Sequence, residues 1–334
     1  MMNLVNHSLL TLIAAMPLLT GLSAVAEETR PEKKAYLDAA SAGPDFAIQG
    51  EYKGALKIDG GELSLGIQVI AEGEGKFAFA AYVGGLPGEG WDGDSIIRGS
   101  GEGKDGEAVL KSDQGRAEIK DGLMTIYSNG GEKAGELKKV DRESPTLGMK
   151  PPEGAVVLFD GTTADKFENG RMSDDKLLME GVTSKDKFTD FQLHLEFRLA
   201  YMPLARGQAR SNSGCYLQGR YEVQILDSFG LSGADNECGG IYKVSRPSQN
   251  MCLEPLKWQT YDVDFTAAKF DEAGKKTSDA VVTVKHNGVV IHNKRRLTIT
   301  PGGPLSTETK EPGPLFLQDH SDPVRFRNIW VKPL

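Results

Sequence analysis

The chain has 334 residues, of which 39% are hydrophobic, and a formal net charge of −8. Its length favours two domains, and its hydrophobic content is sufficient for buried cores. An acidic chain lacks the basic surface that nucleic acid requires, so the composition argues against a nucleic-acid partner and favours neutral or locally steered ligands.

The first 26 residues contain no Lys, Arg, Asp or Glu, and an apolar stretch over residues 9–22 leads to Ala24-Val25-Ala26. Small residues in this spacing are typical of a signal-peptide cleavage site. The alternative is a transmembrane anchor, but the apolar stretch is shorter than the roughly 20 residues that a spanning helix needs. We therefore expect a signal peptide over residues 1–26, export to the periplasm or the extracellular space, and no membrane span after cleavage.

Residues 27–43 are polar and indicate a linker or a loosely docked arm. Over residues 44–140, hydrophobic residues alternate with polar or small ones, as in the segment 63–69, and Asp-Gly steps separate the alternating runs. Period-two alternation predicts strands, and Asp-Gly is typical of tight hairpins. We expect a small antiparallel β domain here, followed by a second linker over residues 141–152, which contain three prolines.

Residues 153–334 show the same alternation in longer runs. Phe191–Leu199 alternates strictly, and Asn287-Gly288 lies between two β-branched runs as a hairpin turn would. Two last strands flank a turn that contains His320. Regularly spaced strands separated by turn residues predict a sandwich of two antiparallel sheets, that is, a jelly roll.

The segment Tyr221–Asp227 is the first candidate for chemistry. Glu222 and Gln224 are two residues apart, so a strand would place them on one face, about 7 Å from each other. A carboxylate beside an amide can bind sugar hydroxyls, and it can act as a general acid or base if its pKa is shifted. An ordinary solvated sheet face produces the same pattern, and that alternative stays open.

Three further segments have a structural and a functional interpretation. Residues 210–214 form either a tight turn or a rim loop that donates hydrogen bonds to a ligand. His320, within 318–322, is either a solvated turn residue or a group that exchanges protons near neutral pH. Tyr242, Lys243 and Trp258 are either core residues or sugar contacts. The sequence has no Gly-rich phosphate loop, H-E-x-x-H or G-x-S-x-G motif, which argues against nucleotide enzymes, zinc proteases and α/β-hydrolases.

The chain has three cysteines, Cys215, Cys238 and Cys252. An exported protein can hold a disulfide. Cys238 and Cys252 flank a loop-like segment and are the expected pair. Cys215 lies within an alternating strand pattern, which indicates a small buried residue, and a catalytic cysteine is the alternative.

Several blocks in the second half resemble the 3-keto-disaccharide hydrolase domain family. In chain order they are Val157–Gly161, Asp190–Arg198, Asn212–Gly214, Tyr221–Asp227, Gly239–Tyr242, Trp258–Tyr261, His286–Gly288, Gly313–His320 and Val324–Trp330. The resemblance covers residues 153–334 and does not reach the N-terminal β domain. Gln259 departs from the asparagine that is usual in the family, and Ser321–Pro323 stands where the family typically has a glycine.

The resemblance implies a concanavalin A-like lectin/glucanase jelly roll that acts on glycosides oxidised to a ketone at C3. Such a ketone acidifies the proton on C2. A base can then remove this proton, the group on C1 leaves by elimination, and water can add back to give net hydrolysis. The implied function is a hydrolase or lyase with a small-molecule or oligosaccharide substrate.

Carried over by residue, the resemblance assigns Glu222 and His320 to proton transfer. The substrate-binding residues it implies are Arg210, Asn212, Gln224, Tyr242, Gln318 and Arg325, with one of the arginines stabilising the enolate oxygen. A divalent metal could polarise the same ketone, with Glu222, Asp227 and His320 as ligands; no other cofactor is implied. The alternatives are a non-catalytic lectin-like module and an assembly protein whose N-terminal domain docks a partner.

Overall fold

The computed structural model describes residues 34–334, so the predicted signal peptide lies outside the described residues. Within them the chain is almost entirely β-structure, which confirms the predicted all-β fold class. The exceptions are α1 (Pro44–Ile48) and a 3-10 helix, η1 (Gly207–Ala209). Within residues 34–334, neither helix has the length and hydrophobicity needed to cross a bilayer.

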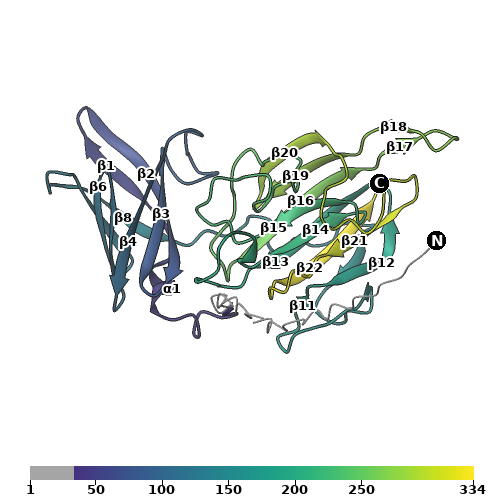
Figure 1. Cartoon of the computed structure of the whole chain (residues 1–334), viewed down its shortest axis with the longest axis horizontal. Coiled ribbons are helices and arrows are strands. Elements are labelled where there is room, and N and C mark those ends of the chain that lie inside the picture. Colours follow the sequence, from purple (N-terminus) through teal and green to yellow (C-terminus); the bar gives the residue numbers. More distant parts are fainter. Residues whose placement is uncertain (1–33) are drawn as a thin grey trace, which may run out of the picture. The chain divides into compact units, whose positions relative to one another are not determined.

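The first eight strands of the described chain form a closed antiparallel barrel (Figure 1). Each strand pairs with the next in sequence, and the last pairs back with the first. In two hairpins Asp105 and Asp121 have φ of 54° and 51°, and each is followed by a glycine with positive φ, as type I′ turns require. The strands are β1 (Gly50–Ile58), β2 (Gly61–Gly73), β3 (Lys76–Val83), β4 (Ile96–Lys104), β5 (Glu107–Ser112), β6 (Gly115–Lys120), β7 (Leu123–Tyr127) and β8 (Lys133–Val140).

Strand β4 has an unusual inner side, made of glycines rather than hydrophobic side chains. A Cβ on Gly99 would lie 2.5 Å from Cε1 of Phe79, and one on Gly103 would lie 2.8 Å from Cε2 of Phe77. Both phenylalanines are buried in the barrel core. The alternating glycines of β4 therefore leave room for aromatic rings from the neighbouring strand β3.

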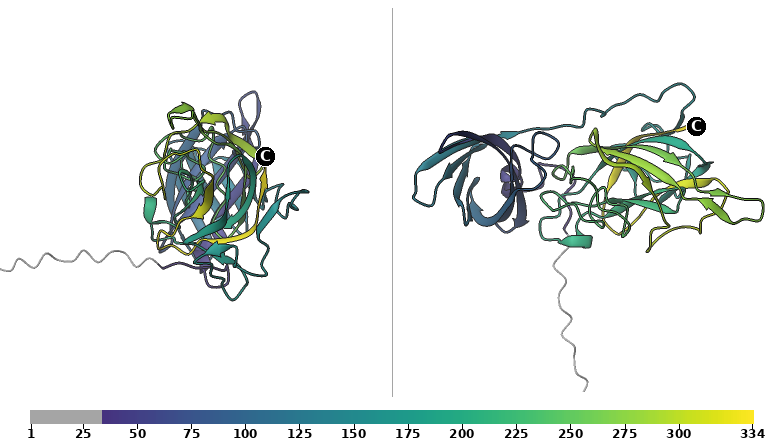
Figure 2. Two further views of the ribbon diagram at one scale, coloured as in Figure 1. Left: turned by 90° about the vertical axis from the view of Figure 1, so that its right-hand side faces the viewer. Right: turned by 90° about the horizontal axis from the view of Figure 1, so that it is seen from above.

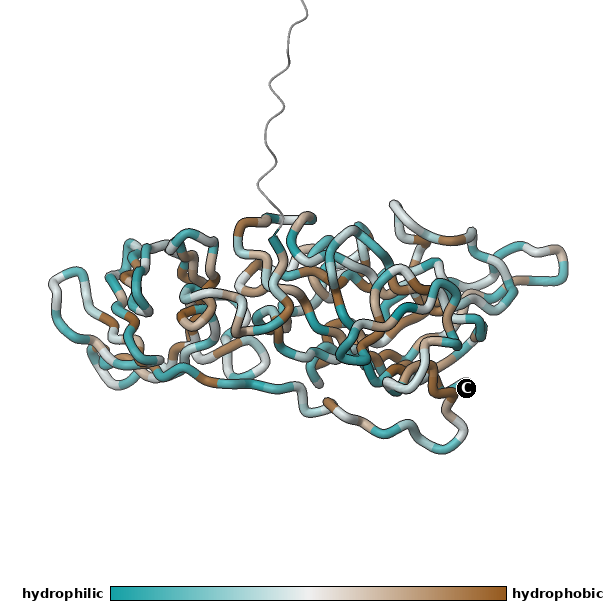
Figure 3. Tube along the Cα trace, turned by 90° about the horizontal axis from the view of Figure 1, so that it is seen from below, coloured by the Kyte–Doolittle hydropathy of each residue, from teal (hydrophilic) through white to brown (hydrophobic). Residues whose placement is uncertain are grey.

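The second half is a sandwich of two sheets around one hydrophobic core, which confirms the predicted jelly-roll type of fold. Figure 3 shows hydrophobic and hydrophilic residues alternating along its strands. The five-stranded sheet contains, in spatial order, β10 (Phe167–Glu168), β12 (Val182–Phe188), β21 (Gly313–Leu317), β14 (Ser213–Leu217) and β15 (Tyr221–Ile225). The seven-stranded sheet contains β11 (Leu178–Met179), β22 (Arg325–Pro333), β13 (Phe191–Arg198), β16 (Trp258–Thr266), β19 (Val281–His286) and β20 (Val289–Arg296), with β9 (Val156–Phe159) paired to β22. A separate ribbon joins β17 (Lys269–Phe270) and β18 (Lys276–Ser278).

The segment 141–152, expected to be a linker, contains no strand, turns at residues 145–148 and contacts the seven-stranded sheet (Figure 2). Thr146 Oγ1 donates a hydrogen bond to Asp262 Oδ2 at 2.7 Å, and the backbone N–H of Gly148 donates to Glu196 Oε1 at 2.6 Å. Both carboxylates flank the buried ring of His194. The described residues, 34–334, belong to one compact unit, and the predicted boundary between two domains stays a prediction.

Candidate functional site

The β14–β15 hairpin determines which side chains leave the core together. In its register Tyr216 lies opposite Glu222, and Gly214 lies opposite Gln224. The intervening residues, such as Val223, are in the hydrophobic core between the sheets. Because strand residues alternate between faces, Tyr216, Glu222 and Gln224 all lie on the outer face of the five-stranded sheet.

A cavity of about 150 Å³ opens on this face. It is lined by Gln208, Asn212, Tyr216, Glu222, Gln224, Tyr242, Pro301, Gly302, Gln318 and His320. Every predicted catalytic and substrate-binding residue except Arg210 and Arg325 is among them. The fold thus brings together side chains, such as those of Asn212 and His320, that are about 100 residues apart in the sequence.

Glu222 has the environment of a group that exchanges protons. Burial raises the pKa of its carboxyl to about 7, although a hydrogen bond from Tyr216 acts in the opposite direction. The Tyr216 hydroxyl donates to Oε2 at 2.7 Å and accepts from Gln318 Nε2 at 3.2 Å. Near neutral pH this carboxyl is present in both protonation states, so it can take up or release a proton.

Gly214 makes the position of this carboxyl sterically feasible. A Cβ at Gly214 would lie 2.9 Å from Cδ of Glu222 and 3.0 Å from the ring of Tyr216. We interpreted Gly214 from the sequence as a turn residue, but it lies within strand β14. Its role is to leave room for the two side chains that line the cavity.

Amide groups form the neighbouring wall. Asn212 Nδ2 donates to the backbone oxygen of Gln208 at 2.8 Å, and Gln224 Nε2 donates to Gln208 Oε1 at 3.2 Å. Asn212 Oδ1 is buried and has no hydrogen-bond partner among the described residues. An unpaired buried acceptor is costly, and a ligand hydroxyl that donated to it would remove that cost.

His320 and Tyr242 complete the rim from two other loops. His320 is exposed and follows β21. Tyr242 is half-buried, and its backbone N–H donates to the backbone carbonyl oxygen of Glu222 at 3.1 Å. An exposed imidazole at the mouth of a cavity is accessible to both solvent and ligand, which suits proton exchange.

The two predicted arginines do not belong to this cavity. Arg210 Nε donates to Asp227 Oδ2 at 2.6 Å, and Arg325 Nη1 donates to Glu180 Oε2 at 2.8 Å. Both guanidinium groups are buried in these ion pairs. The prediction that one of them contacts substrate is therefore corrected, because each already neutralises a carboxylate of the protein.

The predicted metal ligands are not brought together either. Asp227 is held by Arg210 and does not line the cavity that Glu222 and His320 share. Within residues 34–334, no three His, Cys, Asp or Glu side chains gather closely enough to hold a metal ion.

All three cysteines are free and buried, so the predicted Cys238–Cys252 disulfide is not formed in this structure, although the side chains of this pair hydrogen-bond each other. Cys238 Sγ lies 3.3 Å from the Tyr261 hydroxyl, and Cys252 Sγ donates to the Leu253 oxygen at 3.4 Å. Cys215 is in the core, and burial raises the pKa of its thiol. These thiols pack as small hydrophobic groups, so the alternative of a catalytic cysteine loses support as well.

Sequence reasoning missed Tyr216, Gln208 and residues 301–302. Tyr216 could have been found, because the hairpin register places it opposite Glu222. Gln208 lies in the short helix η1 and residues 301–302 lie in a loop, and neither segment has a periodic signal. Trp258, considered as a sugar contact, lies outside the cavity with its ring 4.0 Å from the Arg327 guanidinium.

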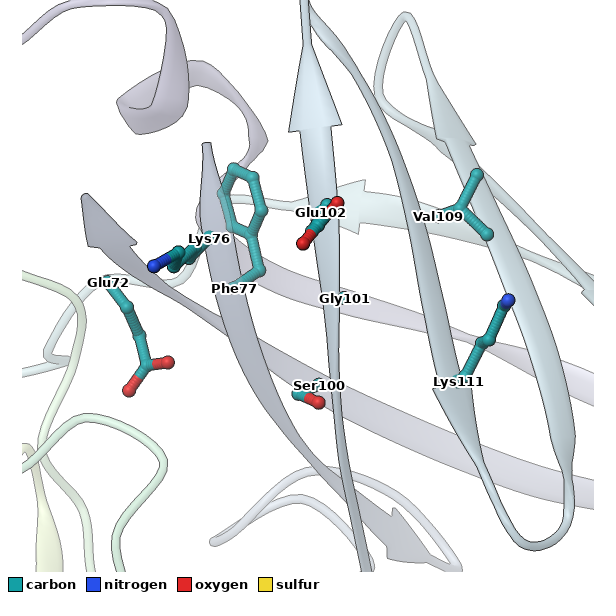
Figure 4. Close-up of a pocket in the computed structure, with 8 residues that line it drawn as sticks. All are labelled: Glu72, Lys76, Phe77, Ser100, Gly101, Glu102, Val109 and Lys111. Carbon is teal, nitrogen blue, oxygen red and sulfur yellow. The ribbon is translucent and has the colours of Figure 1, made fainter. Parts of the chain in front are cut away.

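A larger hollow of about 690 Å³ lies over β3, β4 and β5 of the barrel. Figure 4 shows its charged side chains rising from separate strands without converging on one point. Lys76 lies opposite Glu102 in the strand register, and both side chains are exposed. This hollow lacks a buried ionisable group of the kind that Glu222 provides.

The cavity thus combines a carboxyl whose pKa is close to neutral with amide groups, a combination suited to a carbohydrate-active protein. The chain belongs to the family of the 3-keto-alpha-glucoside-1,2-lyase-like domain, whose model matches residues 154–332. This match confirms the resemblance found in the sequence.

Two solved structures are similar to part of the chain, and both are described as a "putative glycosyl hydrolase" from Parabacteroides distasonis ATCC 8503. The first has 34% identity, covers 55% of this chain and 85% of its own, and has a TM-score of 0.49. The second has 18% identity, covers 55% of this chain and 94% of its own, and has a TM-score of 0.40. None of the curated proteins compared with the chain matches it.

Proposed function

We propose that the protein cleaves glycosides that carry a ketone at C3 of the sugar. The observation that carries this proposal is Glu222, a carboxyl with a pKa of about 7 in a cavity that it shares with His320. Ordinary glycosidases use two carboxyl groups across the scissile bond. Glu222 is the one carboxyl among the described residues that line the cavity, which supports an elimination that needs a single base.

In the proposed reaction the Glu222 carboxylate removes the proton on C2. The electron pair of that C–H bond forms an enolate with the C3 ketone. The enolate collapses to a C1–C2 double bond and a C3 ketone as the C1–O bond breaks, and His320 protonates the departing oxygen. Water that adds across the double bond gives the free 3-keto sugar, so the net result is hydrolysis.

Tyr216 is a positioning residue in this scheme, because its hydroxyl orients the Glu222 carboxylate. Asn212 and Gln224 are assigned to sugar hydroxyls through their amide groups. With the arginines outside the cavity, stabilisation of the enolate oxygen falls to amide N–H donors, such as that of Gln318, and to the His320 imidazolium.

The test is turnover of 3-keto-trehalose. The release of free glucose and the formation of the unsaturated ketone are the two measured readouts. Glu222→Gln should lower kcat by on the order of 10²–10⁴, the usual contribution of a general base, and His320→Ala should lower it as well. Glu168→Gln is the matched control, because Glu168 is exposed on β10 of the same sheet and outside the cavity.

The pH profile provides an independent readout. Because the base must be deprotonated, kcat/KM should fall as the pH drops below about 7, the pKa of Glu222. A Glu222→Gln variant that retains the full rate would remove the assignment. Binding of the 3-keto sugar without any turnover would favour the lectin-like alternative.

Export is a further part of the proposal, supported by the composition of residues 1–26. Expression in a bacterial host should yield a mature protein that begins at Glu27, as determined by N-terminal sequencing. Recovery of the full-length chain inside the cell would contradict it.

A further inference from the structure

The barrel interior is not filled to both ends. At one end, α1 packs against the strands: the Tyr52 hydroxyl donates to the Ile48 oxygen at 2.7 Å, and the Gly75 N–H donates to Asp45 Oδ2 at 2.9 Å. At the other end, formed by the β1–β2, β5–β6 and β7–β8 hairpins, lies a cavity of about 270 Å³.

Small inward side chains create this cavity. Ala81 and Ala117 belong to the buried core of the barrel and also line the cavity, beside larger residues such as Phe79 and Leu110. An eight-stranded barrel is just wide enough to be filled by its own side chains or to hold one small ligand. The alanines favour the second outcome, because larger residues at these positions would occupy the space.

The lining defines the chemistry of a ligand. Its deep part is apolar, and the residues that line it include no Asp or Glu. The cations of the lining are Lys57, which is exposed, and Arg116, which pairs with Glu118 and lies 4.1 Å from the ring of Tyr127. Ile58, also in the lining, is 50% exposed. Lys57 alternates with Leu56, which packs on the barrel core, and lies opposite Glu62 in the strand register, so its side chain is on the outer face. The lining therefore supplies no unpaired charge to the cavity, and the interior suits a hydrocarbon.

We propose that this cavity binds a small, uncharged, mainly apolar molecule. A dry apolar cavity of about 150 Å³ is known to hold a benzene molecule, so the present volume suits a body of about ten non-hydrogen atoms. This site is separate from the cavity around Glu222, and it does not depend on the proposed glycoside cleavage.

The experiment measures binding to the full chain by isothermal titration calorimetry with three compounds: decanoate, 1-decanol and glucose. 1-Decanol should bind with one-to-one stoichiometry, decanoate at least tenfold more weakly because the cavity offers no unpaired cation, and glucose not measurably. Lys57→Gln should leave the affinity for 1-decanol unchanged, because this side chain is on the outer face.

Ala117→Phe should abolish binding of 1-decanol by filling the cavity, and Ala117→Leu is the milder version if the phenylalanine variant does not fold. Ala55→Phe is the matched control, because Ala55 is on β1 but does not line the cavity. Cooperative thermal unfolding shows that each variant is folded. The proposal is overturned if 1-decanol does not bind, or if both folded Ala117 variants bind it as tightly as the unaltered chain. Tighter binding of decanoate than of 1-decanol would overturn the uncharged character of the ligand.

Discussion

Glu222 is a residue whose environment favours chemistry over stability. Its side chain is 2% exposed and accepts one hydrogen bond, from Tyr216, at Oε2. Its other oxygen, Oε1, accepts no hydrogen bond from the described residues. A carboxylate needs several donors to compensate for lost hydration, so burial here favours the protonated form.

This environment has a consequence for the pH dependence of stability. Burial raises the pKa of Glu222 from 4.5 to about 7, so between these values the folded state binds a proton that the unfolded state has released. The Glu222 contribution to the free energy of unfolding is therefore present below pH 4.5 and is lost as the pH rises through 7. Ionisation in the folded state then costs about 3 kcal/mol.

Glu222→Gln should consequently be more stable than the unaltered chain at pH 8, by up to about 3 kcal/mol, and nearly equal to it at pH 4. Guanidinium unfolding at the two pH values measures the difference. Glu168→Gln, on the exposed edge of the same sheet, should show no such pH-dependent gain. A gain for Glu222→Gln that is the same at both pH values would contradict the burial argument.

At the scale of the element, β4 shows packing that overrides strand propensity. Glycine weakens a strand on its own, because it has no side chain to pack and loses more backbone entropy than other residues. In β4, however, the glycines on the inner side lie under the rings of Phe77 and Phe79. The alternating pattern of this strand is thus determined by the neighbour that packs on it.

Gly99→Ala tests this explanation through the sign of the effect. Propensity alone predicts a small gain in stability, whereas the close approach of the Lys111 backbone oxygen and the Phe79 ring predicts a loss of about 1–3 kcal/mol from overpacking. Ser100→Ala, on the outer side of the same strand, should change the free energy of unfolding by less than about 0.5 kcal/mol. Denaturant unfolding of both variants decides the question, and a stabilised Gly99→Ala variant would refute the packing argument.

The segment 141–152 is a second element that local patterns described incompletely. Its prolines indicated a linker, yet Thr146 and Gly148 bond to carboxylates of the seven-stranded sheet. Burial alone would lower the pKa of His194 beneath them, but hydrogen bonds to Asp262 and Glu196 outweigh it and raise that pKa. The hydrogen bonds between this ring and both carboxylates help to explain why acidic residues are tolerated on a covered sheet face.

At the scale of the whole molecule, Arg210 illustrates how a residue can be close to a site in sequence and yet serve the fold. Its guanidinium is buried against Asp227, and its Nη2 donates to the Ala71 oxygen of β2 at 3.3 Å. One side chain thus links the segments around β14 and β15 to the barrel strand. Removing it would leave the Asp227 carboxylate without its cation.

Arg210→Met should therefore destabilise the protein by about 3–5 kcal/mol, the usual cost of breaking a buried ion pair. Well below the unfolding transition, KM for the 3-keto glycoside should change less than tenfold, because Arg210 is outside the cavity. Arg246→Met, at an exposed arginine, is the control for stability. A large rise in KM with unchanged stability would instead restore Arg210 as a substrate contact.

The sequence by itself determined the properties that depend on neighbours along the chain. Period-two alternation and Asp-Gly turns predicted the strands, and they placed Glu222 and Gln224 on one face, since alternate strand residues share a face wherever the strand is located. The ordered family motifs then indicated a carbohydrate-active domain, which the match over residues 154–332 confirmed.

Only the tertiary structure decided the properties that depend on which distant segments meet. It brought His320 and Gln208 to Glu222, engaged both predicted arginines in ion pairs, and left Cys238 and Cys252 as free thiols. The spacing of residues along a strand constrains the direction of a side chain but not its partner across space. The pKa of Glu222 follows from that partner environment, because burial and hydrogen bonding arise only when the sheets have packed.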